Sequence, residues 1–165
     1  SGDRDLSSKG HNMVVVDNAE PYPPNKPYYT EKFRELVGGT HRIMFQLPRG
    51  VELEHDGFSR LTNVGTYRRT WVFDDQELAI TDFIDGSGTH QIEIFFHTQL
   101  PVRHNKKNIK IGEFTLWADG KIDLESTKIW REYGRGEPAT RVIISRRVEL
   151  PHTSRITIVA DNDCM

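Results

Sequence analysis

The stretch Glu113–Thr127, EFTLWADGKIDLEST, contains two runs in which apolar and polar residues alternate. Phe114 and Leu116 occupy alternate positions in the first run, and Ile122 and Leu124 do so in the second. A period of two is typical of a strand with one buried face. The Asp-Gly pair between the runs is a frequent two-residue turn. The stretch therefore predicts two antiparallel strands joined by a tight hairpin.

The same pattern extends through most of the chain. Further strand-like runs cover residues 14–16, 64–73, 78–84, 91–98, 141–150 and 155–160. The Asp-Gly pair at 56–57 also separates two alternating runs and predicts a second tight hairpin, while the pair at 85–86 is a turn signal. The ten to twelve short strands have connections too short for helical crossovers, so we expect antiparallel pairing. The predicted fold class is all-β, an antiparallel β-sandwich of two packed sheets, in which these side chains are mostly buried: Phe45, Trp71, Phe73, Ile80, Ile92, Ile94 and Phe96.

At most one or two short helices are expected. Thr30 can cap a helix whose apolar face carries Phe33, Leu36 and Val37, and the glycine pair at 38–39 would end it. Prolines are dense between residues 17 and 27 and block both helix and ladder pairing, which predicts a long surface connection there.

Length and composition exclude several classes. A chain of 165 residues predicts a single β-sandwich domain over 1–165. No run approaches the roughly 18 apolar residues of a membrane helix, so we expect no membrane span. The formal charge of −2 disfavours nucleic acid as a partner. The single cysteine, Cys164, excludes an internal disulfide and a cysteine metal cage. Because the sequence begins Ser-Gly without an initiator Met, we expect it to be a piece of a longer protein.

Histidines provide the candidate chemistry. His55, His90 and His97, with Glu93, could form a zinc site of a small metal-dependent enzyme, because imidazole and carboxylate are zinc ligands. His97 and Glu93 can share one face of a strand, since residues two apart point the same way. The alternative is that each histidine is a hydrogen-bonded packing residue at a strand end or turn. The residues alone leave both interpretations open.

A second candidate is an anion or sugar surface. Arg68 and Arg69 stand beside Tyr67 and Trp71, and Arg60 is nearby in the sequence. Aromatic faces stack on sugar rings and guanidinium groups pair with carboxylates. The alternative is an ordinary strand with solvated alternate residues. The sequence shows no Ser-His-Asp signature, phosphate-binding glycine loop or cysteine nucleophile.

Six segments follow one another in the order of a known family pattern: His11–Asp17 (pattern H-N-T-V-x-V-D), Glu54–Phe58 (H-D-G-Y), Tyr67–Thr70 (H-R-R-T), Leu78–His90 (L-x-V-x-D-x-x-x-G-x-G-x-H), Phe96-His97 (a strand ending in an aromatic and His) and Tyr133–Pro138 (Y-G-x-x-E-P). In these segments and their order, the chain resembles heparinase II/III-type polysaccharide lyases over about residues 4–150.

This resemblance implies the C-terminal β-sandwich of a larger protein with an N-terminal α/α-toroid domain. Such enzymes cleave acidic, uronate-containing polysaccharides by β-elimination, using toroid residues as the base and to neutralise the carboxylate. The partners implied are the toroid and an acidic polysaccharide, and the location implied is periplasmic or secreted. The chain alone is expected to be inactive. The alternatives are a stand-alone carbohydrate-binding or interaction module and the metal-dependent enzyme above.

The resemblance also implies one metal ligand, His11, which matches the histidine that in some members is the third ligand of a structural Zn²⁺. The other expected ligands belong to a G-H-x-H-x-D segment, which this sequence lacks. Zinc is therefore expected in the intact longer protein and not in the isolated chain. The sequence departs from the family pattern at Met13, where Thr is usual, at Leu6, where an aromatic is common, and at Phe58, where Tyr is usual.

Overall fold

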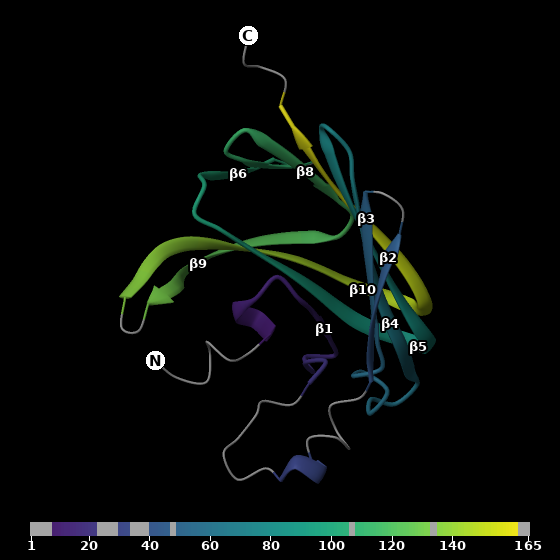
Figure 1. The fold of residues 1–165 in the computed structure, drawn as a ribbon. Helices are drawn as coiled ribbons and strands as arrows, with labels where there is room; N and C mark the ends of the chain where they lie inside the picture. The colour runs from purple at the N-terminus through teal and green to yellow at the C-terminus, as the bar shows by residue number, and fades with distance from the viewer. Residues whose placement is uncertain are drawn as a thin grey trace.

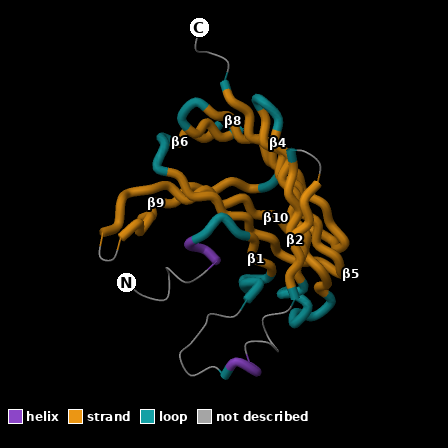
Figure 2. Tube along the Cα trace, in the orientation of Figure 1, coloured by secondary structure: helices purple, strands orange, loops and turns teal. Residues whose placement is uncertain are grey.

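The computed structural model describes residues 8–22, 30–33, 40–46, 49–105, 108–132 and 135–161, and most of these are in strands (Figure 2). The described elements are the 3-10 helix η1 (Ser8–Gly10) and the strands β1 (Val14–Val16), β2 (His41–Gln46), β3 (Gly50–His55), β4 (Val64–Phe73), β5 (Glu77–Thr98), β6 (Val102–His104), β7 (Ile109–Ile111), β8 (Phe114–Ala118), β9 (Lys121–Glu132) and β10 (Arg135–Ala160). All pairings are antiparallel, which confirms the predicted fold class.

Two long strands, β5 and β10, connect the two layers of the fold (Figure 1). In the first layer, residues 77–84 of β5 pair with residues 152–159 of β10, and the strand order is β2-β3-β4-β5-β10-β8-β7-β6. In the second layer, residues 88–98 of β5 pair with residues 140–150 of β10, flanked by β1 and β9. Hydrogen bonds thus join all ten strands into one sheet, although the sequence predicted two separate ones.

β5 passes from one layer to the other at two glycines, and β10 does so beside them at residues 150–152. Gly86 and Gly88 of β5 have φ angles of 139° and 85°, which other residues rarely adopt. On β10, the pairing register shifts between Leu150 and His152, directly opposite this bend. Strands that change layer commonly do so at such bends. The Asp-Gly pair at 85–86 therefore bends a continuous strand and does not end it.

The main core lies between the layers and follows the alternation of β5. Ile80 and Ile84 from the first layer and Ile92 and Ile94 from the second are all at most 3% exposed. They belong to one cluster with these other buried residues: Val14, Val16, Phe58, Val64, Tyr67, Ile109, Leu116, Val142, Ile144, Leu150 and Ile156. Trp71 and Phe96, predicted as core, are partly buried against this cluster, while the side chain of Phe45 lies outside the described residues.

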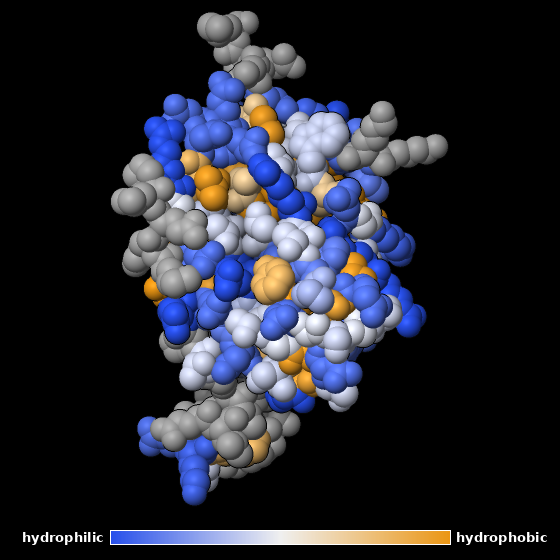
Figure 3. Space-filling view, turned by 90° about the vertical axis from the view of Figure 1, so that its right-hand side faces the viewer, coloured by the Kyte–Doolittle hydropathy of each residue, from blue (hydrophilic) through white to orange (hydrophobic). Residues whose placement is uncertain are grey.

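Phe73 contradicts the predicted core, because its ring is 46% exposed. It is the last residue of β4 and lies beside the exposed turn at 74–76. Alternation predicts which face of a strand a side chain occupies, but not where along the strand the covering layer stops. Apolar side chains elsewhere on the surface are scattered among hydrophilic ones, as the side view in Figure 3 shows.

Neither predicted tight Asp-Gly hairpin forms, although the strands on either side of the pair at 56–57 do pair with each other. β8 pairs with β7 and β10 in the first layer, whereas β9 pairs with β10 in the second, so the Asp119-Gly120 connection crosses between layers. Gly120 has a φ of 125°, and a Cβ there would lie 2.8 Å from the Ser145 carbonyl oxygen. β3 and β4 do pair, but residues 56–63 form a longer loop between them.

Outside the sheet, the predicted helix lies only partly in the described residues. Residues 31–33 are helical, and the Phe33 amide donates to the Thr30 hydroxyl at 3.1 Å, as expected of a cap. The part carrying Leu36 and Val37 lies outside the described residues. No helix in the described ranges is long and apolar enough to cross a membrane.

Candidate functional site

His90 joins the end of β1 to the bend in β5. Its Nδ1 lies 2.7 Å from Asp17 Oδ2, and its Nε2 lies 3.0 Å from the Ser87 carbonyl oxygen. The hydrogen bond with Asp17 raises the pKa of His90, despite the opposing effect of burial. The other Asp17 oxygen accepts the Gln91 amide at 2.9 Å. Because both ring nitrogens already have protein partners, this histidine holds two segments together and has no free nitrogen for a metal.

His55 packs among aromatic rings in the interior. Its ring centroid lies 4.9 Å from that of Tyr67 and 5.6 Å from those of Tyr22 and Phe58. The Gly57 amide donates to His55 Nδ1 at 3.2 Å. The imidazole is 5% exposed, so the packing interpretation applies to this residue.

His97 and Glu93 lie on the face of β5 turned away from the main core. Asn12 Oδ1 accepts the His97 backbone amide at 2.8 Å and lies 3.3 Å from His97 Nδ1. Burial and the positive charge of Arg141 lower the pKa of His97, and His11 acts in the same direction. The ring is therefore a neutral imidazole at pH 7.

Among the described residues, no three His, Cys, Asp or Glu side chains are placed to hold a metal ion. Glu93 Oε2 lies 3.8 Å from Lys9 Nζ, and His11 is exposed in the turn before β1. The fold thus places the four residues of the metal-enzyme hypothesis in three environments, in which only Glu93 and His97 share a strand face. Spacing along the chain cannot reveal this separation of His55 and His90 from the other two.

Arg69 and Asp82 form a buried ion pair between β4 and β5. The guanidinium donates to both carboxylate oxygens, at 2.6 and 2.9 Å, and the two side chains are 5% and 2% exposed. The Tyr67 hydroxyl donates to the same carboxylate at 2.6 Å, and Arg69 also donates to the Asn12 carbonyl at 3.1 Å. Burial and the Asp82 charge raise the pKa of Tyr67, so its hydroxyl stays protonated. The cluster links β1, β4 and β5.

The predicted sugar surface is therefore not assembled. Arg69 and Tyr67 are interior residues. Arg68 remains on the surface and pairs with Glu54 at 2.9 Å, while Arg60 donates to the backbone carbonyls of Pro21, Gly57 and Glu20. These contacts give the arginines structural roles.

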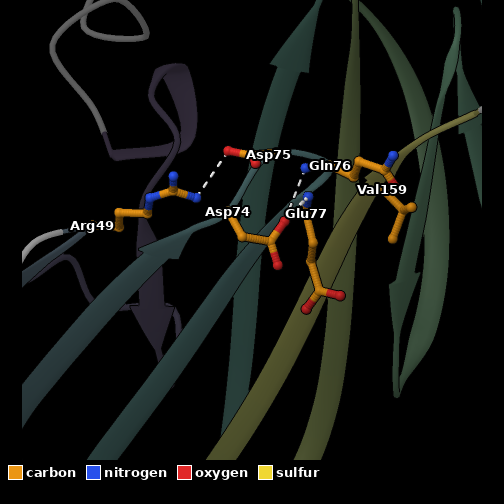
Figure 4. A pocket seen from close by; sticks show the side chains of 6 residues that line it. All are labelled: Arg49, Asp74, Asp75, Gln76, Glu77 and Val159. Atoms are coloured by element: carbon orange, nitrogen blue, oxygen red, sulfur yellow. Dashed lines mark hydrogen bonds and ion pairs between the residues drawn. The ribbon is translucent and has the colours of Figure 1, made fainter.

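An open hollow lies at the β4–β5 turn, where Asp74 accepts the amides of Gln76 and Glu77 and Arg49 pairs with Asp75 at 2.8 Å (Figure 4). These hydrogen bonds and this ion pair stabilise the turn. A cavity of about 50 Å³ lies beside the Arg69 cluster, lined by Leu53, His55, Phe58 and Trp71, and it is too small for a sugar.

The sequence reasoning missed one charged feature, the β6–β7 hairpin. Residues 94–112 contain no Asp or Glu but four Lys or Arg residues, in a chain of net charge −2. This acid-free stretch was visible in the sequence. Only the fold shows that Arg103 and Lys110 lie opposite each other at the edge of the first layer.

Comparisons with known proteins agree with this architecture. The family described as "Heparinase II/III-like, C-terminal" matches residues 5–159. A heparinase III, the BT4657 gene product, has a TM-score of 0.64 and 13% identity, covering 93% of this chain and 24% of that one. Heparan sulfate lyase HepC from Pedobacter heparinus has a TM-score of 0.65 and 10% identity, covering 96% of this chain and 25% of that one. Another heparinase III structure has a TM-score of 0.64 and 14% identity, covering 97% of this chain and 25% of that one.

A search of curated proteins found no match. The chain spans about a quarter of the length of the similar structures. At these identities the structural likeness shows the fold, and the family match over nearly the whole sequence shows the relationship predicted from the motifs. The chain therefore belongs to the heparinase II/III-like, C-terminal family.

Proposed function

We propose that this chain is the C-terminal β-sandwich domain, over residues 1–165, of a polysaccharide lyase that cleaves uronate-containing glycans by β-elimination. One observation carries the proposal. The family match covers residues 5–159, yet the chain corresponds to only about a quarter of each similar structure, and these include a heparan sulfate lyase. The remaining three quarters would include the N-terminal α/α-toroid, which we propose as the partner of this domain.

In this proposal the chain has no lyase activity alone. β-Elimination requires a base beside the proton α to the carboxylate and a group that neutralises that carboxylate. The polar motif residues of the described chain already serve internal contacts, since Arg69 pairs with Asp82 and His90 with Asp17. Their role is to hold β1, β4 and β5 together, so that the sandwich can support the toroid and form one wall of its cleft.

A complete zinc site would form only in the longer protein. His11 is exposed, and no three potential ligands converge in the described part of the chain. The described residues thus supply at most one imidazole and do not fit a complete zinc site. We propose that His11 contributes one ligand and that the others come from outside this sequence. A periplasmic or secreted location would suit the reaction, because polysaccharides of this kind are extracellular.

The test compares the 165-residue chain with the longer protein at equal molar concentration. Both are incubated with heparan sulfate and with alginate, and the ultraviolet absorbance of unsaturated uronate ends is followed. Circular dichroism confirms that the chain is folded, and elemental analysis after dialysis gives zinc per chain. The expected result is product from the longer protein alone. Product from the isolated chain would overturn its inactivity, and no product from the longer protein on either glycan would overturn the lyase assignment.

A further inference from the structure

The β6–β7 hairpin concentrates positive charge at one edge of the first layer. β6 is the last strand in that layer's order, and β7 pairs with it from Val102 to His104. The hairpin turn is closed by a hydrogen bond from the Asn105 amide to the Asn108 carbonyl oxygen at 3.1 Å and by two side-chain bonds between the same asparagines. This closure holds the two strands in a defined register.

That register sets two cations against each other. Arg103 and Lys110 are direct cross-strand partners and project from the same face. Like charges in directly opposite positions destabilise a strand pair. Asp161 offsets part of this repulsion, because its carboxylate lies 2.6 Å from Lys110 Nζ and also accepts the Thr115 hydroxyl at 2.5 Å. Arg103 is exposed and makes no ion pair with any residue in the described ranges.

An exposed tryptophan lies on the same face of the sheet. Lys110 is opposite Thr115 on β8, and Trp117 follows two residues later, so both β8 side chains point the same way as the two cations. Two residues along a strand span about 7 Å, which puts Trp117 diagonally next to Lys110 on the side of the hairpin turn. Trp117 is 45% exposed.

We propose that Arg103, Lys110 and Trp117 form a binding site for an acidic polysaccharide. The inference rests on the proposed function for the identity of the ligand. A tryptophan face stacks on a sugar ring, and the adjacent cations pair with its sulfate or carboxylate groups. A cluster of Lys and Arg is also a recognised signal for heparin-type polyanions. The exposed Trp117 is a feature that an unliganded sheet edge does not need, and Arg103, which has no ion-pair partner in the described ranges, adds a cation on the same face.

The test measures binding of the 165-residue chain to heparan sulfate by calorimetry, with alginate and desulfated heparan sulfate as parallel probes. Arg103→Gln and Trp117→Ala should each weaken binding by roughly tenfold, because Arg and Trp dominate the binding energy of such contacts. Raising the salt concentration should weaken binding of the unaltered chain, since exposed charges are screened. Tighter binding of heparan sulfate than of its desulfated form would identify sulfate as the recognised group, and equal binding with alginate would identify the carboxylate.

Matched controls come from the second layer. Trp130 is 41% exposed on β9 and has Lys128 Nζ 6.0 Å from its ring centroid, so Trp130→Ala removes a similar aromatic beside a cation. Lys121→Gln removes an exposed positive charge from the same strand. Both controls should bind like the unaltered chain. The proposed site would be overturned if the control variants lost as much affinity for heparan sulfate as the site variants. It would also be overturned if Arg103→Gln and Trp117→Ala lost none.

The two proposals fail separately. If the longer protein cleaves neither glycan but the chain loses binding in the two site variants, the lyase assignment fails and the binding site stands. If the longer protein is active but the variants bind normally, the binding site fails and the lyase assignment stands. If the variants bind normally but aggregate, the cations serve only to protect the sheet edge, which also overturns the binding site.

Discussion

Replacing Asp82 by Asn should strongly destabilise the domain. The carboxylate accepts two bonds from Arg69 and one from Tyr67, and both members of the ion pair are at most 5% exposed. Burial disfavours the charged guanidinium, but the adjacent Asp82 carboxylate outweighs this effect and raises the pKa of Arg69. The substitution would therefore leave a buried, charged guanidinium without its counter-ion. Breaking a buried pair in this way costs about 3–5 kcal/mol. For a domain of this length that corresponds to a melting temperature lower by about 6–20 °C.

The assay is urea unfolding followed by circular dichroism, with the free energy of unfolding compared at equal m-values. Glu77→Gln is the matched control on the same strand, because it breaks the exposed pair with Arg155 and should cost at most about 1 kcal/mol. Adding Arg69→Met to Asp82→Asn should restore much of the loss by removing the unpaired charge. If Asp82→Asn costs no more than Glu77→Gln, the buried pair does not stabilise the fold and the reasoning is refuted.

Three further predictions concern the core, a close backbone approach and a titrating histidine. Ile94→Ala should lower the free energy of unfolding by about 2–5 kcal/mol, because Ile94 is fully buried, and a value near zero in urea unfolding would contradict its place in the core. Gly57→Val should lower the melting temperature, because a Cβ at Gly57 would lie 2.4 Å from the Pro21 carbonyl oxygen, and an unchanged melting curve would show that this approach relaxes freely. The hydrogen bond to Asp17 raises the pKa of His90 above its ordinary 6.5, so the stability that His90 contributes is complete below about pH 6.5 and is lost as the pH rises through the folded-state pKa. The difference in unfolding free energy between the unaltered chain and His90→Gln should therefore shrink as the pH rises from 6.5 through the folded-state pKa of His90, and a difference that is constant or grows with pH would have the wrong sign.

The strands could be predicted because their signal is local. Alternation in 64–73, 78–84, 91–98 and 141–150 reports which residues face the core, and each of these runs lies in a strand. The layer crossing could not be predicted in the same way. The Asp-Gly pair at 85–86 has the composition of a turn, but whether a glycine with positive φ ends a strand or bends it depends on the partner strand beside it.

The Asp119-Gly120 hairpin failed for the same physical reason. Alternating runs around a turn signal predict two strands, and both are present as β8 and β9. Each, however, finds a different part of β10 as its partner, because β10 is long enough to run through both layers. Which segment of a long strand is open to a given partner is decided only in the assembled sheet.

The candidate site shows a related limit. The motifs that contain His11, His55, Asp82 and His90 predicted the family, and the family match over residues 5–159 confirms that prediction. The sequence did not predict which partner each of these side chains would have, because hydrogen-bonded residues such as Asp17 and His90 are 73 positions apart.

By itself, therefore, the sequence determined the all-β class, the alternation of the core residues and the family. Local alternation of apolar and polar residues indicates the first two, and the order of the motifs indicates the third. Only the tertiary structure decided that one continuous sheet forms both layers, that Arg69 is buried against Asp82, and that Arg103, Lys110 and Trp117 share one face. The reason is that pairing register and burial arise from contacts between residues distant in the chain, and these contacts exist only once the layers have packed.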